Sequence, residues 1–420
     1  MKKFLLLILI LFLAAPVYAM NITDNIDFGG EVRLRGYDFQ NFWDFDYHND
    51  YDNYSTFRLR SSLYAKVSLE NNVSGFIKFT NQTYGEGVGV GDNKDNKVFV
   101  DNAYIDVKKL FNTPLTLRTG RQNLMYGTGF VLFDGQSQFA STSLYFDGIK
   151  LSFPIGDRAV VDCLYFKDEE NNRADDYPDD DDITLAGAYL TAHCPVLHGQ
   201  QELYALNRED KNTDKDIWMY GLRLSDKFDF GLDYSGEIAL QTGDAANGED
   251  QDALGYKLQT GYTFDVPAKP RFFIGYTSLE GDDSDTSDFE GWDVFYGGWP
   301  QFGDLLAWMY VNIPPNKIGQ GTTTVPGEAT YTNLNMATVG LSSSYKKLFV
   351  EASYTDLKFE ENVAGSDDFG AYYQVRAHYA YSKNLSFAMY AAMIEPDKSF
   401  EDRGMRDEAY EFYWETRLKF

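Results

Sequence analysis

Residues 408–420 end the chain and read EAYEFYWETRLKF. From Tyr410 to Phe420 the even positions are apolar or aromatic apart from one threonine, and the odd positions are mostly charged. Because successive side chains of a strand point to opposite faces, this period of two predicts a strand with one apolar face and one wet face. A soluble sheet can carry the same alternation, but a terminal strand that closes with an aromatic residue is typical of an outer-membrane β-barrel.

The other end of the chain predicts export. Two lysines precede the apolar run Phe4–Ala15, and small residues follow at Val17 and Ala19. This order is that of a secretory signal peptide, residues 1–19. A membrane-spanning helix would need about 20 apolar residues, which is more than this run offers. The remaining residues 20–420 are then expected to form a single barrel domain.

Alternating stretches recur along the whole chain, and they are rich in tyrosine and phenylalanine, which favour strands. The predicted fold class is therefore all-β: a transmembrane antiparallel β-barrel of about 18 strands in a Gram-negative outer membrane. The predicted strands are 28–39, 54–70, 73–84, 98–108, 114–122, 143–153, 158–167, 183–194, 200–207, 216–225, 228–243, 253–265, 270–279, 332–344, 347–358, 370–382, 384–395 and 408–420.

The connections between these strands alternate in length. Short turns follow the even-numbered strands, as at Asn71-Asn72, and are expected on the periplasmic side. Longer, acidic connections follow the odd-numbered strands and are expected to face outward. These predicted outer loops include 40–53, 85–97, 168–182, 244–252, 359–369 and 396–407.

The excess of acidic over basic residues limits the partners that the protein is expected to bind. The formal net charge is −27, which argues against nucleic-acid binding through a basic patch. Acidic outer loops suit divalent cations and lipopolysaccharide, and loop-bound Ca²⁺ or Mg²⁺ is the one cofactor that we consider. The candidate ligands are Asp179, Asp180, Asp181 and Asp182. We also expect contacts with outer-membrane lipid, recognition of the C-terminal strand by the barrel-assembly machinery, and a monomeric barrel.

Residues 280–331 are much longer than the other connections. They combine an acidic stretch, several aromatic residues and a double proline, and they leave room for a short helix near Asp304 to Tyr310. Connections of this length are usually functional or disordered. Our hypothesis is that the segment caps or enters the pore, and the alternative is a surface loop.

Charged faces of the strands are expected to point into the barrel, since an arginine or lysine facing lipid near the midplane costs about 2–4 kcal/mol. Arg118 and Arg121 lie on opposite parity, so a bulge or strand end is needed to turn both inward. The predicted channel-lining residues are Arg33, Arg35, Arg58, Arg60, Lys66, Lys78, Arg118, Arg121, Lys150, Arg223, Lys257, Arg376, His378 and Arg417. Such a lining favours anions, and the alternative is that each arginine merely pairs with a neighbouring acid.

Residues 100–129 read VDNAYIDVKKLFNTPLTLRTGRQNLMYGTG, and residues 143–153 read SLYFDGIKLSF. Together with the early RLRSS run at residues 58–62, these stretches resemble the alginate-export family of outer-membrane channels. The resemblance implies an 18-stranded monomeric barrel that passes an anionic uronate polymer along an arginine-rich constriction. It implies roles for Arg118 and Arg121 in the motif and for Arg58 and Arg60 in the early basic strand.

The predicted function is passage or export of an anionic carbohydrate or polysaccharide through a basic lumen. A less selective porin for small anionic solutes is the alternative within transport. A barrel-embedded hydrolase would need an activated nucleophile or water. The four histidines, His48, His193, His198 and His378, lie in no hydrolase or metal motif, so we do not expect an enzyme.

The two cysteines, Cys163 and Cys194, would lie in an oxidising compartment. Whether they form a disulfide stays open. Two cysteines at this spacing predict no metal or thiol chemistry.

Overall fold

The fold was taken from a computed structural model of the chain. It describes residues 25–42, 45–46, 48, 53–84, 98–133, 145–169, 182–194, 198–211, 213–283, 285–297, 303–312, 332–363, 365–401 and 404–420. The predicted signal peptide, residues 1–19, lies outside these residues, as do Asp179, Asp180 and Asp181. Among the described helices, none is long and apolar enough to cross a membrane.

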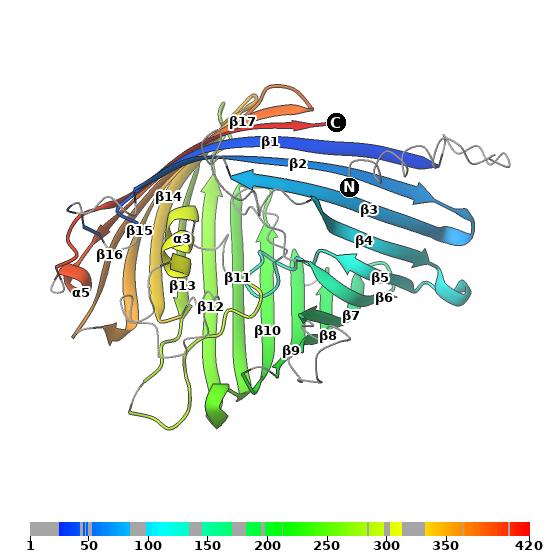
Figure 1. The fold of residues 1–420 in the computed structure, drawn as a ribbon, viewed down its shortest axis with the longest axis horizontal. Helices are drawn as coiled ribbons and strands as arrows, with labels where there is room; N and C mark the ends of the chain where they lie inside the picture. Colours follow the sequence, from blue (N-terminus) through cyan, green and yellow to red (C-terminus); the bar gives the residue numbers. More distant parts are fainter. Residues whose placement is uncertain are drawn as a thin grey trace.

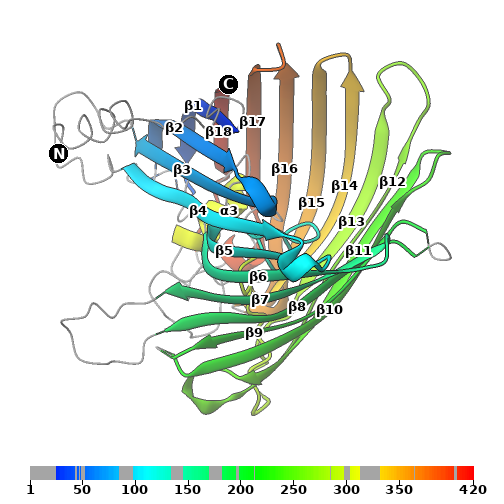
Figure 2. The same ribbon diagram turned by 90° about the vertical axis from the view of Figure 1, so that its right-hand side faces the viewer.

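In the described part of the chain, eighteen antiparallel strands form one closed sheet, because β1 pairs with both β2 and β18 (Figures 1 and 2). The strands are β1 Ile26–Gln40, β2 Tyr54–Ser68, β3 Val73–Tyr84, β4 Val98–Lys108, β5 Thr116–Gln122, β6 Phe146–Ile155, β7 Ala159–Glu169, β8 Ile183–Ala192, β9 Gln200–Asp210, β10 Lys215–Lys227, β11 Leu232–Asp244, β12 Asp250–Thr263, β13 Arg271–Leu279, β14 Leu334–Tyr345, β15 Leu348–Val363, β16 Ser366–Ala380, β17 Leu385–Pro396 and β18 Ala409–Lys419. Two α-helices, α3 Asp304–Asn312 and α5 Lys398–Glu401, lie in connections.

The terminal strand closes the barrel as its alternation predicts. Phe420 exchanges backbone hydrogen bonds of 3.0 and 2.9 Å with Gly30 of β1. Further along the seam, Gly36 is the register partner of Trp414, and its missing side chain makes room for the indole. A Cβ at position 36 would lie 2.5 Å from the indole nitrogen, so this close approach requires glycine.

The inner and outer faces follow the parity of the sequence. In β2, Arg58 and Arg60 are buried on the inner face, whereas Phe57 and Leu63 are 55% and 62% exposed on the outer face. An outer surface of exposed aliphatic and aromatic side chains is what a lipid environment requires, and the polar inner face is then shielded from lipid.

The eighteen predicted strands and the closed barrel are confirmed, and the β3 and β4 ranges match the prediction. One predicted loop is wrong. Residues 359–369 are mostly strand, because β15 continues to Val363 and β16 already begins at Ser366. The register between these strands shifts near Lys358, so a bulge rather than a loop accommodates the charged stretch.

The lumen is partly filled by its own connections. Residues 123–133, between β5 and β6, join residues 289–297 through backbone hydrogen bonds between Phe133 and Tyr296 (3.1 Å) and between Tyr296 and Val131 (3.0 Å). Phe130 stacks on Trp292, with ring centroids 5.4 Å apart. We call these two segments together the inner plug.

Helix α3 lies within the ring of strands (Figures 1 and 2). The predicted short helix near Asp304 is therefore confirmed. Its described side chains Leu305, Leu306, Ala307 and Met309 are fully buried. The structure thus places α3 and the buried residues Trp292, Phe295 and Tyr296 of segment 280–331 inside the barrel, whereas residues 285–288 are exposed.

Cys163 and Cys194 are both free thiols. Cys163 is exposed on β7, and Cys194 is half-buried beyond the end of β8. The disulfide that the sequence left open is absent between these two described residues.

Candidate functional site

A cavity of about 480 Å³ lies against β1–β5 and β18, at the end of the barrel where the connections are short. We call it the cationic cavity. Phe420 and the early β1 residues Gly30 and Glu31 border it, so the cavity lies in the half of the lumen near the short turns. The basic side chains that line it are Arg33, Arg60, Lys78, Arg118, Arg417 and Lys419, and Glu31 is the acidic one.

An aromatic strip runs along the wall of this cavity. The rings of Tyr64, Phe76 and Tyr104 come from three neighbouring strands and stack on one another, with centroids 5.6 and 5.1 Å apart. The guanidinium carbon of Arg118 lies 4.0 Å from the Tyr104 ring centroid and extends the strip by a cation–π contact. The wall therefore offers flat apolar surfaces directly beside positive charge.

Two carboxylates hold the cations of this wall in place. Asp106 accepts two hydrogen bonds from the Arg118 guanidinium, of 2.7 and 2.9 Å. Asp101 is fully buried and contacts Arg60 at 3.3 Å and Lys78 at 3.0 Å. A bulge in the pairing of β3 with β4 beside Lys78 turns both Asp101 and its neighbour Asn102 inward.

Further along β1 and β2 toward the long-loop end, beyond Arg33 and Arg60, lies a buried arginine cluster. Arg35 donates to Glu415 and to the Tyr37 hydroxyl, each at 2.6 Å, and its guanidinium lies 4.6 Å from the Tyr413 ring centroid. Arg58 donates to the same Tyr37 hydroxyl at 3.0 Å. Both guanidinium groups are thereby fixed, and Arg35 is fully buried.

Helix α3 begins on this cluster. The Asp304 carboxylate lies 4.0 Å from the Arg35 guanidinium, and the Asp304 backbone N–H donates to the Tyr390 hydroxyl at 3.3 Å. The Asp304 carboxyl also faces Glu411 of β18. Burial raises the pKa of the Asp304 carboxyl above its ordinary value, and the Arg35 and Arg58 guanidinium groups offset only part of this effect.

The inner plug is held to the opposite wall by another buried carboxylate. Asp293 contacts Arg208 of β9 at 2.7 Å and Lys215 of β10 at 3.5 Å. Burial alone would raise the pKa of Asp293, but these two cations outweigh burial and hold the pKa below its ordinary value. Tyr126 of the plug stacks on Tyr189 of β8 at 4.1 Å.

Other predicted channel-lining residues lie on the inner face but away from the cationic cavity. Lys150 lies 3.7 Å from Asp162, and Arg223 is bound to Glu202 at 2.5 Å. Lys257 and Arg376 line a separate cavity bounded by β12–β17. Lys66 and His378 are exposed near the short-turn ends of β2 and β16.

The inward placement predicted for Arg121 is wrong. Strand β5 keeps a regular register with both neighbours, so Arg121 points to the face opposite Arg118. It pairs with Asp147 at 2.6 Å and lies 3.9 Å from the Tyr145 ring centroid. The charge is tolerated outside because Arg121 is the penultimate residue of β5, where the cost of an outer charge is about 0–1 kcal/mol.

Of the four predicted cation ligands, the structure describes one. Asp182, the one described member of the predicted acidic cluster, is paired with Lys167 at 2.7 Å. The outer loops instead bring Asp46, His48 and Asp407 together, with one ligand atom of each within 4.8 Å of the others. This group could not be predicted from the sequence, because Asp407 is distant from Asp46 and His48 in the chain.

Parity alone could have found part of the aromatic strip. Tyr64 shares the inner face of β2 with Arg60, and Phe76 shares that of β3 with Lys78. The docking of Asp304 and Asp293 could not be found in this way, since neither residue lies on a strand.

The barrel architecture has several known counterparts. Solved structures that are similar include OpdO of Pseudomonas aeruginosa (TM-score 0.60, 11% identity, covering 94% of this chain and 97% of that chain). OccAB2 of Acinetobacter baumannii has a TM-score of 0.60 at 13% identity, covering 96% and 99%, respectively. The outer membrane protein OprD of P. aeruginosa has a TM-score of 0.58 at 12% identity, covering 94% and 93%. At these identities the likeness shows the fold.

No curated protein sequence matches this chain. The family model described as alginate export matches residues 24–413, which is nearly the whole chain. The resemblance drawn from residues 100–129, 143–153 and 58–62 is therefore confirmed, and the protein is an outer-membrane β-barrel channel. The chain belongs to the alginate export family.

Proposed function

We propose that this channel passes an anionic carbohydrate through the cationic cavity. The observation that carries the proposal is the adjacency of the aromatic strip and the cations, with Arg118 against the Tyr104 ring at 4.0 Å. A guanidinium group matches the geometry of a carboxylate. An aromatic ring offers an apolar surface on which the C–H face of a sugar can lie. The carboxylate and the apolar C–H face of a uronate would thus each find a partner on the same wall.

Among the described side chains, the charges at the cationic cavity do not cancel. Six basic side chains line it, and four carboxylates, Glu31, Asp101, Asp106 and Glu415, pair with members of this set. Six positive charges against four negative charges leave an excess of two. The alternative interpretation was that each arginine merely pairs with a neighbouring acid, and these four carboxylates do pair in this way. The remaining excess of positive charge nevertheless supports attraction of an anion in a narrow lumen.

A less selective porin for small anionic solutes is the second candidate. The inner plug and α3 favour it, since they occupy part of the lumen and narrow the passage. The two candidates differ in what they hold. A carbohydrate channel binds successive sugar units, whereas a small-anion porin needs only the charge.

We further propose that the barrel resides in a Gram-negative outer membrane as a monomer. In this setting the apolar outer face contacts lipid, the outer loops face lipopolysaccharide, and the assembly machinery recognises the C-terminal strand. The support is the exposed apolar belt and the pairing of Phe420 at the seam.

Block of single-channel current by hexagalacturonate in a planar bilayer tests the proposal. The charge-balanced variant R118Q/D106N removes the bidentate pair as a unit. It should lower the association constant about tenfold or more, the equivalent of one charged hydrogen-bonded contact. R121Q, whose side chain lies on the outer face, should leave the block unchanged. Absence of block by hexagalacturonate, together with passage of monomeric galacturonate, would favour the small-anion porin.

A further inference from the structure

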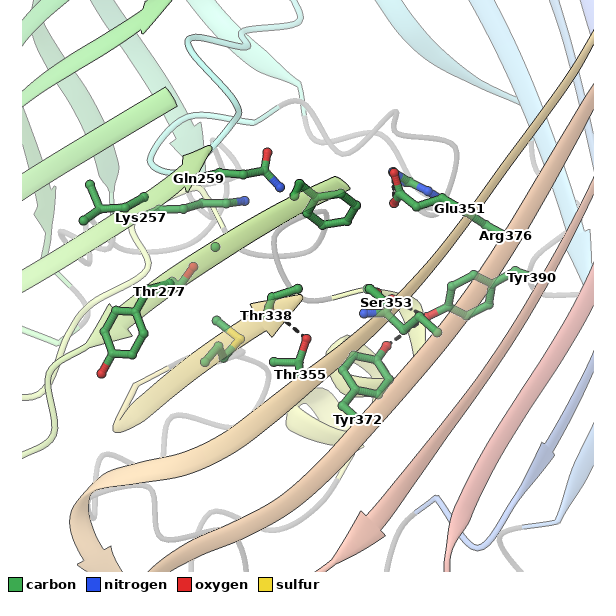
Figure 3. A pocket seen from close by; sticks show the side chains of 17 residues that line it. Lys257, Gln259, Thr277, Thr338, Glu351, Ser353, Thr355, Tyr372, Arg376 and Tyr390 are labelled. Atoms are coloured by element: carbon green, nitrogen blue, oxygen red, sulfur yellow. Dashed lines mark hydrogen bonds and ion pairs between the residues drawn. The ribbon is translucent and has the colours of Figure 1, made fainter. Parts of the chain in front are cut away.

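A second cavity of about 150 Å³ lies on a different part of the inner wall, bounded by β12–β17 (Figure 3). In Figure 3, side chains from β12 and β13 face those from β15 and β16 across a common space. The uncharged polar side chains that line it are Gln259, Thr277, Thr338, Ser353, Thr355 and Gln374. We call it the neutral cavity.

The charged groups at this cavity are compensated by adjacent partners. Arg376 contacts Glu351 at 2.6 Å on the neighbouring strand. Lys257 is the register partner of Glu237 on β11. These opposite charges balance, in contrast with the excess of positive charge at the cationic cavity. An ion gains little from such a lining, whereas an uncharged polar molecule can replace its lost hydration by hydrogen bonds with the wall.

Several of the polar groups are available to a ligand. Among the described residues, the side chains of Gln259, Thr277 and Ser353 make no hydrogen bond with one another or with their neighbours. The Thr338 and Thr355 hydroxyls are only 2.8 Å apart, and each retains capacity for a further bond. The wall therefore presents donors and acceptors in mixed order, as the hydroxyl groups of a sugar require.

Gly303, which directly precedes α3, forms part of the wall of the neutral cavity. Gly303 precedes the helix with φ of +82°, and a Cβ there would overlap the Gln374 amide oxygen and the Tyr372 hydroxyl. The Tyr390 hydroxyl donates to Gln374 at 2.9 Å. These contacts fix the Gln374 amide in the cavity wall. The neutral cavity is thus a shaped polar site at the edge of the plugged lumen.

We infer that the neutral cavity binds an uncharged, hydroxyl-rich sugar unit of the transported glycan. This inference rests on the proposed function, because it assigns a second binding site to the same carbohydrate. The cationic cavity would then hold the acidic units and the neutral cavity the uncharged ones.

Current block by three neutral oligosaccharides, maltohexaose, cellohexaose and mannohexaose, tests the inference in the full-length refolded barrel. At least one of them should block the channel. The variant Q259L/S353A removes two of the available polar groups. It should lower the association constant of the blocking hexaose about tenfold. Y354F is the matched control, because Tyr354 lies on the outer face of the same strand as Ser353. It should bind the sugar as the parent does.

The outcomes separate the inference from the proposed function. Block by hexagalacturonate without block by any neutral hexaose would overturn the neutral site and leave the anionic-carbohydrate channel standing. Equal neutral block in Q259L/S353A and the parent would also overturn it. Absence of block by both kinds of sugar would remove both proposals. If the double variant folds poorly, S353A replaces it. This variant deletes one hydroxyl and should show a smaller loss in the association constant of the neutral hexaose.

Discussion

Asp304, the first residue of α3, lies with its carboxylate 4.0 Å from the guanidinium of Arg35, the most deeply buried arginine of β1. This contact joins the long connection between β13 and β14 to the first strand of the barrel, β1. The Asp304 carboxyl faces a second carboxyl, that of Glu411, and burial raises the pKa of Asp304 although Arg35 and Arg58 lie nearby. Because two adjacent buried carboxylates would repel each other, this pair retains one proton.

The first prediction concerns pH. Burial raises the pKa of Asp304, so docking of α3 is fully stabilised below the ordinary carboxyl pKa, about 3.9, and weakens as the pH rises through the raised pKa. Single-channel conductance should therefore increase on going from acidic to alkaline pH as α3 leaves its site. D304N, which cannot ionise, should remove most of this dependence.

D304L serves as the control for D304N, because it removes the polar contact with Arg35 together with the charge. It should increase conductance at every pH. A parent conductance that falls as the pH rises would contradict the assignment of the retained proton to this pair.

A second prediction concerns the inner plug. R208Q leaves the buried Asp293 carboxylate with Lys215 as its one described cation, and removal of one partner of a buried pair costs about 3–5 kcal/mol. We expect the plug to leave the wall in a large fraction of molecules, with larger single-channel conductance. The lowered pKa of Asp293 means that docking in the parent is stable above the ordinary carboxyl pKa and is lost as the pH falls through the lowered value.

R208Q/D293N tests this explanation, since it removes both charges and should restore most of the parent conductance. If the double variant conducts like R208Q, the ion pair does not hold the plug.

The third prediction concerns the aromatic strip. F76L/Y104L keeps the volume apolar but removes two of the flat surfaces that stack at 5.1 Å. Hexagalacturonate should block this variant about tenfold more weakly, whereas chloride conductance should change little, because small anions need no stacking surface. If hexagalacturonate block and chloride conductance fell equally, the aromatic strip would only support the position of Arg118.

The fourth prediction concerns stability at the seam. G36A places a methyl group 2.5 Å from the Trp414 indole nitrogen and should lower the free energy of unfolding by about 1–3 kcal/mol in urea titrations. G75A is the control, since its nearest neighbour, a Val67 methyl, lies 3.3 Å away. It should be close to neutral.

Strand parity carried most of the prediction of the fold. It placed Arg58 and Arg60 inside and Phe57 outside, because a charge in lipid costs more than any local preference gains. The same rule failed at Arg121, where the strand end removes that cost. Charge composition failed at residues 359–369, because a bulge lets an acidic stretch remain in a sheet that extends beyond the membrane.

The candidate site was only partly predictable. The cations of the cationic cavity lie on strands, so periodicity found Arg33, Arg60 and Arg118. The inner plug and α3 depend on contacts between connections, such as Phe133 with Tyr296, which no period in the sequence encodes. The segment 280–331 could be recognised as unusual, but its docking on Arg35 could not.

The most direct test is the zero-current potential of the refolded mature barrel in a planar bilayer under a salt gradient. The excess of positive charge at the cationic cavity predicts anion selectivity that falls in R33Q/R60Q/R118Q and stays unchanged in R121Q, with strand content checked by circular dichroism. Cation selectivity of the parent protein, or equal selectivity in the triple variant, would contradict the role of these arginines in passage.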